Sequence, residues 1–112
     1  MRTDRGKSTV AGDFMIPVVL FVFRRKDTLA RIFERIRLVQ PRKMYILSDG
    51  PRNEEEKEDV KQVRAEIDRL IDWECDVNKN YAECNRGVFK IIGLGAKWVL
   101  SKEECAIFLE DD

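Results

Sequence analysis

The chain has 112 residues, of which 44% are hydrophobic, and this length and composition fit one compact domain with its own core. Lys and Arg together number 21, Asp and Glu together also number 21, and histidine is absent. The balanced charge is not that of an evident polyanion binder, so no nucleic-acid partner is predicted, and the missing histidine excludes Ser-His-Asp and Cys-His catalysis within this chain.

The cysteines and the distribution of charge further limit the kinds of protein that the chain can be. Three scattered cysteines without a C-x-x-C pair argue against a zinc site and favour reduced thiols in a cytoplasm. Residues 1–43 carry 11 Lys or Arg against 4 acids, whereas residues 44–112 carry 10 against 17. This asymmetry predicts a basic face suited to phosphates or a membrane surface, or else an unevenly charged solvated surface.

The first part of the chain predicts a tail and then a buried strand. Residues 1–13 are polar and lack periodicity, which predicts a loose tail or a remnant of cloning. The apolar run FMIPVVLFVF at 14–23 is half the length needed to span a bilayer, and three cations follow it where a signal peptide needs small residues. Its β-branched and aromatic residues at 17–23 predict a strand buried on both faces of a parallel sheet.

A helix and a second strand follow. Apolar residues recur at helical spacing between 29 and 36, and Asp27 or Thr28 is predicted to cap this helix. The short apolar run Met44–Leu47 predicts a second strand, which ends at the Ser-Asp-Gly-Pro turn of residues 48–51. These elements make one β-α-β step.

The middle of the chain predicts a second helix and an edge strand. Asn53 is predicted to cap a helix with acids at its positive N-terminal end and an apolar stripe from Val60 to Leu70. The acids between 54 and 68 are interpreted as a solvated helix face. The segment WECDVNK at 73–79 alternates in polarity, which predicts a strand at the edge of the sheet.

The last third of the chain predicts a third helix and a closing strand. Helical spacing resumes over 86–101, where Gly93 and Gly95 are expected to mark close packing on the sheet. The run 105–109 predicts a final buried strand. The complete order, β-α-β-α-β-α-β, predicts an α/β fold that is Rossmann-like, with a mostly parallel sheet between two helical layers.

Charged residues follow three of the predicted strands, at the edge of the sheet where folds of this class bind ligands. Arg24–Lys26 follow the first strand, Asp49 and Gly50 follow the second, and the acids 110–112 follow the last. Three consecutive carboxylates repel one another unless a cation binds them, which predicts Mg²⁺ or Mn²⁺ holding nucleotide phosphates; a plain acidic surface is the competing interpretation. No P-loop and no G-x-G-x-x-G is present, which argues against ATPases and dinucleotide-dependent dehydrogenases.

With these elements in place, the chain resembles the donor-binding half of a GT-A glycosyltransferase of the bacterial family-2-like group. The similarity covers nearly all of residues 16–112 and is most specific at Ser48-Asp49-Gly50, at Asn85 and Gly87, and at Glu110-Asp111-Asp112, which resembles the E-D-D form of the metal-binding D-x-D motif. The resemblance implies an enzyme that transfers a sugar from a nucleotide diphosphate, with a UDP-sugar as first choice, to a hydroxyl of a glycan or lipid acceptor.

The resemblance also implies roles for individual residues around the nucleotide-sugar. Phe23 and Arg24 would line its base and ribose, and Asp49 would contact the base or ribose. Either Arg86 or Lys90 would face the diphosphate. Plain alternatives stand beside these roles: Phe23 as core, Asp49 as a turn former, and the two cations as surface. Arg24 departs from the family pattern, where a small polar residue is common, and is expected to contact phosphate or obstruct the base.

The implied metal site lies at the end of the chain. Asp112, helped by Glu110, would hold Mn²⁺ or Mg²⁺ on the diphosphate, and Asp111 would approach the ribose. The resemblance makes residues 14–112 the N-terminal nucleotide-sugar-binding half of a GT-A domain. The acceptor-binding half with its catalytic base is expected to follow Asp112, so that the chain is a truncated GT-A domain without activity of its own.

Two other hypotheses remain open. The chain is alternatively a non-catalytic module for nucleotide sensing or partner association, in which an open sheet edge pairs with a second copy to form a homodimer. A Toprim-like or receiver-like phosphotransfer fold ranks last, because Arg24 and Arg25 occupy the place of its expected acid after the first strand. A cytoplasmic location is predicted in each case, with peripheral association at the inner face of the membrane.

Overall fold

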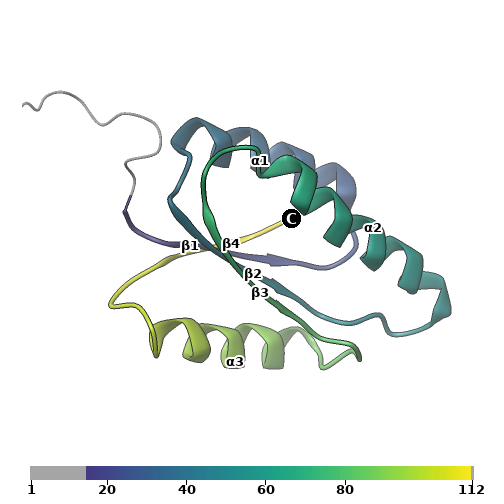
Figure 1. Cartoon of the computed structure of the whole chain (residues 1–112). Helices are drawn as coiled ribbons and strands as arrows, with labels where there is room; N and C mark the ends of the chain where they lie inside the picture. The colour runs from purple at the N-terminus through teal and green to yellow at the C-terminus, as the bar shows by residue number, and fades with distance from the viewer. Residues whose placement is uncertain (1–14, 112) are drawn as a thin grey trace, which may run out of the picture.

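The computed structural model describes residues 15–111, which form a four-stranded parallel sheet between two layers of helices (Figure 1). The elements in chain order are β1 (Val18–Val22), α1 (Lys26–Val39), β2 (Lys43–Ser48), α2 (Glu54–Leu70), β3 (Asp76–Tyr81), α3 (Val88–Leu100) and β4 (Ile107–Glu110). The predicted Rossmann-like α/β order is therefore confirmed. The tail predicted at 1–13 lies outside the described residues.

The strands lie in the order β3-β2-β1-β4, so the side on which the chain adds strands changes at β1. The chain builds outward from β1 to β2 and β3, and then returns to the other side of β1 to lay down β4, with all three pairings parallel. Val18 of β1 accordingly pairs with Met44 on one side and with Ile107 on the other. Such a reversal leaves a crevice at the carboxyl ends of the two strands that flank it, because their following segments diverge to opposite faces.

Helices α1 and α2 cover one face of the sheet (Figure 1). The buried stripe of α1 (Leu29, Phe33, Ile36) and that of α2 (Val63, Ile67) pack against the apolar side chains that β1 and β2 direct to this face. The predicted apolar stripes of both helices are confirmed, and so is the cap at Asn53, whose side chain accepts a hydrogen bond from the Glu56 N–H at 3.0 Å.

Helix α3 is the only described helix on the opposite face of the sheet (Figure 1), and Gly95 sets its distance from the strands. A Cβ atom at Gly95 would lie 2.7 Å from Leu47 Cδ1 and 3.3 Å from Phe21 Cε1, so a larger residue would push the helix off the strands. The prediction of close packing is confirmed for Gly95. It is wrong for Gly93, where a Cβ atom would meet nothing within 4 Å.

Two further predictions about the ends of elements are wrong. Helix α1 begins at Lys26 after Arg25, so neither Asp27 nor Thr28 caps it, and no side chain bonds to its first turn from the capping position. The closing strand is not buried, because within residues 15–111 β4 pairs with β1 and has no strand on its other side. Ile107 and Phe108 each remain 38% exposed as a result.

Strand β3 occupies the other edge of the sheet, as its alternating sequence predicts. Within residues 15–111, no helix is long and apolar enough to cross a membrane.

The turn after β2 is packed tightly against the turn after β3. The Ala82 N–H donates to the Ser48 carbonyl at 2.9 Å, and the Arg64 guanidinium donates to the Ala82 carbonyl at 2.8 Å. Gly50 lies so close to the second turn that a Cβ atom would be 2.6 Å from the carbonyl carbon of Cys84. Backbone atoms cannot yield as a flexible side chain can, so this position requires glycine.

Replacing Gly50 with alanine is therefore expected to lower the free energy of unfolding by about 1–3 kcal/mol, the usual range for overpacking. Gly93→Ala is the matched control, because it adds the same methyl group to an exposed helix and is expected to raise the free energy of unfolding by about 0.5–1 kcal/mol. Urea unfolding followed by circular dichroism measures both changes. Equal stability of the two variants would contradict the close approach at Gly50.

Candidate functional site

A cleft with a volume of about 850 Å³ opens at the carboxyl ends of β1, β2 and β4. It lies at the reversal of strand order beside β1, where a ligand is expected in this class of fold. One wall is apolar and comes from α3, through Val88, Ile91 and Ile92. The opposite wall is charged and comes from the segment after β1 and from the turn before α2, through Arg24, Arg25, Lys26 and Arg52.

The Asp49 carboxylate holds the loop between β3 and α3 on the floor of this cleft. Asp49 follows β2 and is only 8% exposed. Its Oδ1 accepts hydrogen bonds from the Gly50 and Arg86 N–H groups, both at 2.8 Å. Its Oδ2 accepts from the Asn85 side-chain amide at 3.1 Å and from the Gly87 N–H at 3.0 Å.

These four bonds fill the lone-pair positions of the Asp49 carboxylate, which has two on each oxygen. Asp49 borders the cleft as predicted, but its carboxylate is bound by the protein instead of projecting into the crevice. The arrangement is that of an anchor for the start of α3. A direct contact between Asp49 and a base or ribose stays a prediction, and it requires a ligand to replace one of these donors.

Gly87 completes the anchor because it turns the chain into α3. Its φ of +94° lies in a region that residues with a side chain rarely adopt. Its N–H bonds to Asp49, and its carbonyl accepts the Ile91 N–H at 3.0 Å as the first bond of the helix. Asn85 adds a bond from its amide to the Gly50 carbonyl at 2.9 Å. The Asn85 and Gly87 pair singled out from the sequence therefore shapes the loop that closes the cleft.

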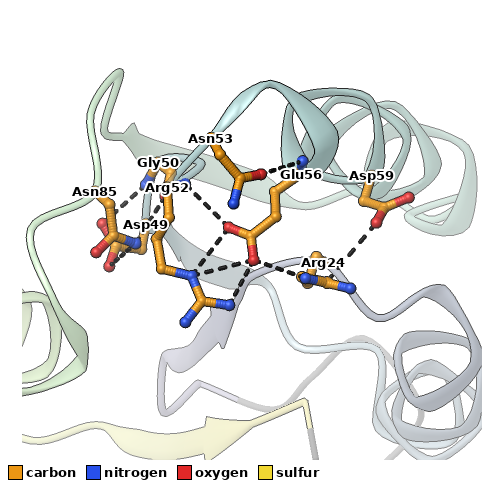
Figure 2. A network of polar contacts seen from close by, with 8 residues as sticks. All are labelled: Arg24, Asp49, Gly50, Arg52, Asn53, Glu56, Asp59 and Asn85. Atoms are coloured by element: carbon orange, nitrogen blue, oxygen red, sulfur yellow. Dashed lines mark hydrogen bonds and ion pairs between the residues drawn. The ribbon is translucent and has the colours of Figure 1, made fainter.

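A second polar network joins the charged wall to α2, and Figure 2 shows Glu56 at its centre between two arginines. The Glu56 carboxylate accepts from Arg24 Nη1 at 2.6 Å, from Arg52 Nη2 at 2.5 Å and from the Arg52 backbone N–H at 2.9 Å. Arg24 Nε also lies 3.7 Å from the Asp59 carboxylate. Glu56 itself is 4% exposed, so this ion cluster is partly removed from water.

The side-chain and backbone hydrogen bonds from Arg52, joined by the bond from Arg24, lower the pKa of Glu56 to about 2. The interpretation of the acids between 54 and 68 as a wholly solvated face is wrong at this residue. A signal was present in the sequence: Glu56 lies four residues before Val60 and seven before Val63, which places it on the buried stripe of α2. It is also the third residue after the Asn53 cap, the position of the acid in a capping box.

Phe23 and Arg24 both line the cleft, as predicted, but they differ in how they face it. The half-buried Phe23 ring has the Arg52 guanidinium above it, 5.7 Å from the ring centre, which is within range of a cation–π contact. Arg24 is turned to the acids of α2 and is neutralised there. Arg52, which the sequence interpretation missed, therefore lies beside both predicted residues and links them.

Two of the three acids at the end of β4 are placed by the structure, and both line the cleft. Glu110 and Asp111 line it, and Asp111 is tied to β1, with its N–H donating to the Phe21 carbonyl at 3.2 Å and its Oδ2 accepting the Phe23 N–H at 3.3 Å. Asp112, the main predicted metal ligand, lies outside the described residues. Carboxylate oxygens suit Mn²⁺ and Mg²⁺ chemically, but residues 15–111 contain no group of three or more acids, cysteines or histidines placed to hold an ion.

Arg86 and Lys90 are not brought into the cleft. Both side chains are exposed, and neither is among the residues that line it. Arg86 contributes its backbone N–H to the Asp49 anchor instead. The positive charge in the lining comes from Lys26 and from three ion-paired arginines. Arg24 and Arg52 share Glu56, and Arg25 lies 3.3 Å from the Asp27 carboxylate. The predicted contact of Arg86 or Lys90 with a diphosphate stays a prediction, and the cations that do line the cleft come from the segment after β1 and the turn before α2.

Asp49→Asn is expected to release the β3–α3 loop, because asparagine offers one acceptor oxygen where the anchor uses two and its amide would face other donors. Hydrogen bonds to charged groups contribute about 1.5–3 kcal/mol each, so a loss of about 2 kcal/mol in the free energy of unfolding is expected. Hydrogen exchange should be faster at the Arg86 and Gly87 amides. Unchanged exchange at both amides would contradict the anchor.

The depressed pKa of Glu56 predicts a specific dependence of stability on pH. A carboxylate whose pKa is lowered on folding stabilises the folded state above its ordinary pKa of 4.5, and that stabilisation is lost as the pH falls through about 2. Glu56→Gln should therefore be less stable than the parent protein near neutral pH, and the difference should shrink to nothing in strong acid. Glu55→Gln, one residue away and exposed, is the control and should show no such difference.

A gap between the two variants that persists unchanged into strong acid would show that Glu56 is not the group that titrates. Urea midpoints measured across the acid range provide the test.

No family model matches this chain, and no curated protein or solved structure matches it either. The functional conclusion therefore depends on the cleft and its residues.

Proposed function

We propose that the cleft binds the nucleotide part of a nucleotide-diphosphate sugar, and that the chain is the donor-binding part of a glycosyltransferase. One observation carries the proposal. At the reversal of strand order beside β1, a single cleft brings together the ring of Phe23, basic side chains after β1, and the acids that follow β4. These are the three kinds of group that a base, a diphosphate and a divalent metal require.

Different residues are proposed to contact the base, the diphosphate and the metal, according to their chemistry. The Phe23 ring offers a flat apolar face for the base. The Arg52 guanidinium lies over this ring and is held in place by its hydrogen bond to Glu56. Arg25 and Lys26 supply positive charge for the diphosphate. Glu110, with Asp112 beyond the described residues, would hold Mn²⁺ or Mg²⁺. When bound, that ion would offset the charge that develops on the departing diphosphate.

In the proposed reaction, the bond between the sugar and the diphosphate breaks and a bond from the sugar to an acceptor hydroxyl oxygen forms. The hydroxyl proton passes to a base that is not assigned to any described residue. The donor is proposed to be a UDP-sugar and the acceptor a glycan or lipid. The site of action is proposed to be the cytoplasmic face of a membrane.

A non-catalytic nucleotide sensor is the second candidate, and two observations favour it. The Asp49 carboxylate is fully occupied by protein donors, and Arg24 is neutralised by Glu56. A site built in this way would bind a nucleotide through the Phe23 ring and the cations that line the cleft without needing a metal. Metal dependence of binding therefore separates the two candidates.

Calorimetry with UDP, in the presence and absence of Mn²⁺, tests the proposal. Binding is expected to strengthen with Mn²⁺, and Asp112→Ala should remove that gain. Phe23→Ala should weaken binding by about 1–3 kcal/mol, the usual contribution of an aromatic side chain that stacks on a base. Phe89→Ala is the matched control, because Phe89 is 90% exposed, does not line the cleft and should not change binding.

Binding that is equal with and without Mn²⁺ and unaffected by Asp112→Ala would favour the sensor. Absence of binding to any nucleoside diphosphate would contradict both candidates.

A further inference from the structure

Helix α3 presents apolar side chains to solvent as well as to the sheet. Phe89 is 90% exposed, Leu94 is 53% exposed and Leu100 is 49% exposed. Phe89, Gly93 and Leu100 are spaced at i, i+4 and i+11, so they share one side of the helix, away from the buried Gly95 and Val99. We define the α3 outer face as Phe89, Lys90, Gly93, Leu94, Lys97 and Leu100.

An exposed face of this kind differs from an ordinary surface helix. A surface helix normally carries charged residues opposite its buried stripe, whereas a helix that is apolar all round is usually covered on every side. Among residues 15–111, α3 is the only helix on its side of the sheet, and Figure 1 shows no other helix beside it. Scattered exposed apolar residues need no explanation, but a group of them on one short helix is a candidate interaction surface.

The charge around the α3 outer face shows what kind of partner fits it. From Asn85 to Lys102 the sequence contains four cations and no acid, although the whole chain has as many acids as Lys and Arg. Lys90 and Lys97 belong to the face itself and are both exposed. Helix α2, on the opposite side of the sheet, is rich in acids instead. A partner that fits the α3 outer face therefore has negative charges at its surface, which meet the lysines, and apolar groups beneath them, which cover the exposed apolar side chains.

We propose that the α3 outer face docks the protein on a membrane that contains anionic lipids. Phe89 and Leu100 would enter the boundary between headgroups and acyl chains, and Lys90 and Lys97 would contact the lipid phosphates. The interaction is peripheral, since no helix within residues 15–111 can span a bilayer. It does not require nucleotide binding, and it deepens the membrane location given in the proposed function by naming the surface that makes the contact.

A second copy of the chain fits this face less well. In a two-fold dimer each patch meets its own copy, so Lys90 and Lys97 would lie near the same lysines of the partner. Like charges held together at an interface oppose association. An anionic lipid surface has the opposite charge, and its hydrocarbon covers the apolar side chains without requiring a complementary protein shape.

Sedimentation of the full chain with lipid vesicles tests the proposal. Binding is expected with phosphatidylcholine vesicles that contain phosphatidylglycerol, and it should be weak with phosphatidylcholine alone and decrease as salt is added. Removing the charge of Lys90 and Lys97 with a double Lys→Gln change should lower partitioning roughly 25-fold, because each basic residue near such a surface contributes about a factor of five. Phe89→Ser should lower it roughly tenfold or more.

Matched control variants lie on the opposite side of the sheet. Leu38→Ser removes a side chain of α1 that is 80% exposed, and Lys57→Gln with Lys61→Gln removes two charges from α2. These variants should bind vesicles as the parent protein does. Circular dichroism should show all variants folded, because the changed side chains are exposed.

Three results would overturn the proposal. One is the absence of binding to anionic vesicles at low salt. Another is loss of binding in the control variants with no effect of the α3 changes. The third is a dimer in lipid-free solution that Phe89→Ser dissociates, since this would assign the α3 outer face to a second copy.

Discussion

The α3 side of the cleft depends on the four hydrogen bonds that the Asp49 carboxylate accepts. Asp49 ends one buried strand, and its partners Asn85, Arg86 and Gly87 begin the path into α3. Because a buried carboxylate without partners would be costly, the loop is held in one arrangement. The close approach of Gly50 to the Cys84 backbone makes that arrangement sterically possible. The apolar wall of the cleft is placed by this anchor, since it belongs to the first turns of α3.

The arrangement of the charged wall of the cleft depends on Glu56. Glu56 is shared by Arg24 and Arg52, so it holds both guanidinium groups in place at the edge of the cleft. Arg52 is thereby kept above the Phe23 ring. A ligand phosphate entering the cleft would meet Lys26, and Arg25 with its partner Asp27, beside these two arginines. The charged wall is thus preorganised by an acid of α2, which reduces the side-chain entropy lost on binding.

The layered fold could be predicted because buried strands and helical stripes are visible in local sequence. The run 17–23 and the stripe from Val60 to Leu70 needed no information from elsewhere in the chain. The exposure of β4 could not be predicted, because an apolar strand reads the same whether it has one neighbour or two. The anchor at Asp49 could not be predicted either, since its bonds to Arg86 and Gly87 join residues more than 35 positions apart. Glu56 was predictable from its spacing to Val60, but its partner Arg24 was not.

The most direct test of the account is a nuclear magnetic resonance titration of the labelled protein with UDP, comparing Mn²⁺ with Mg²⁺. Paramagnetic Mn²⁺ broadens the signals of amides near the bound ion. The account predicts selective broadening at Phe23, Arg24, Glu110 and Asp111, while Asp68 near the far end of α2 keeps its signal. Broadening confined to the acids of α2, or no UDP-dependent broadening at the end of β4, would contradict a nucleotide and metal site in this cleft.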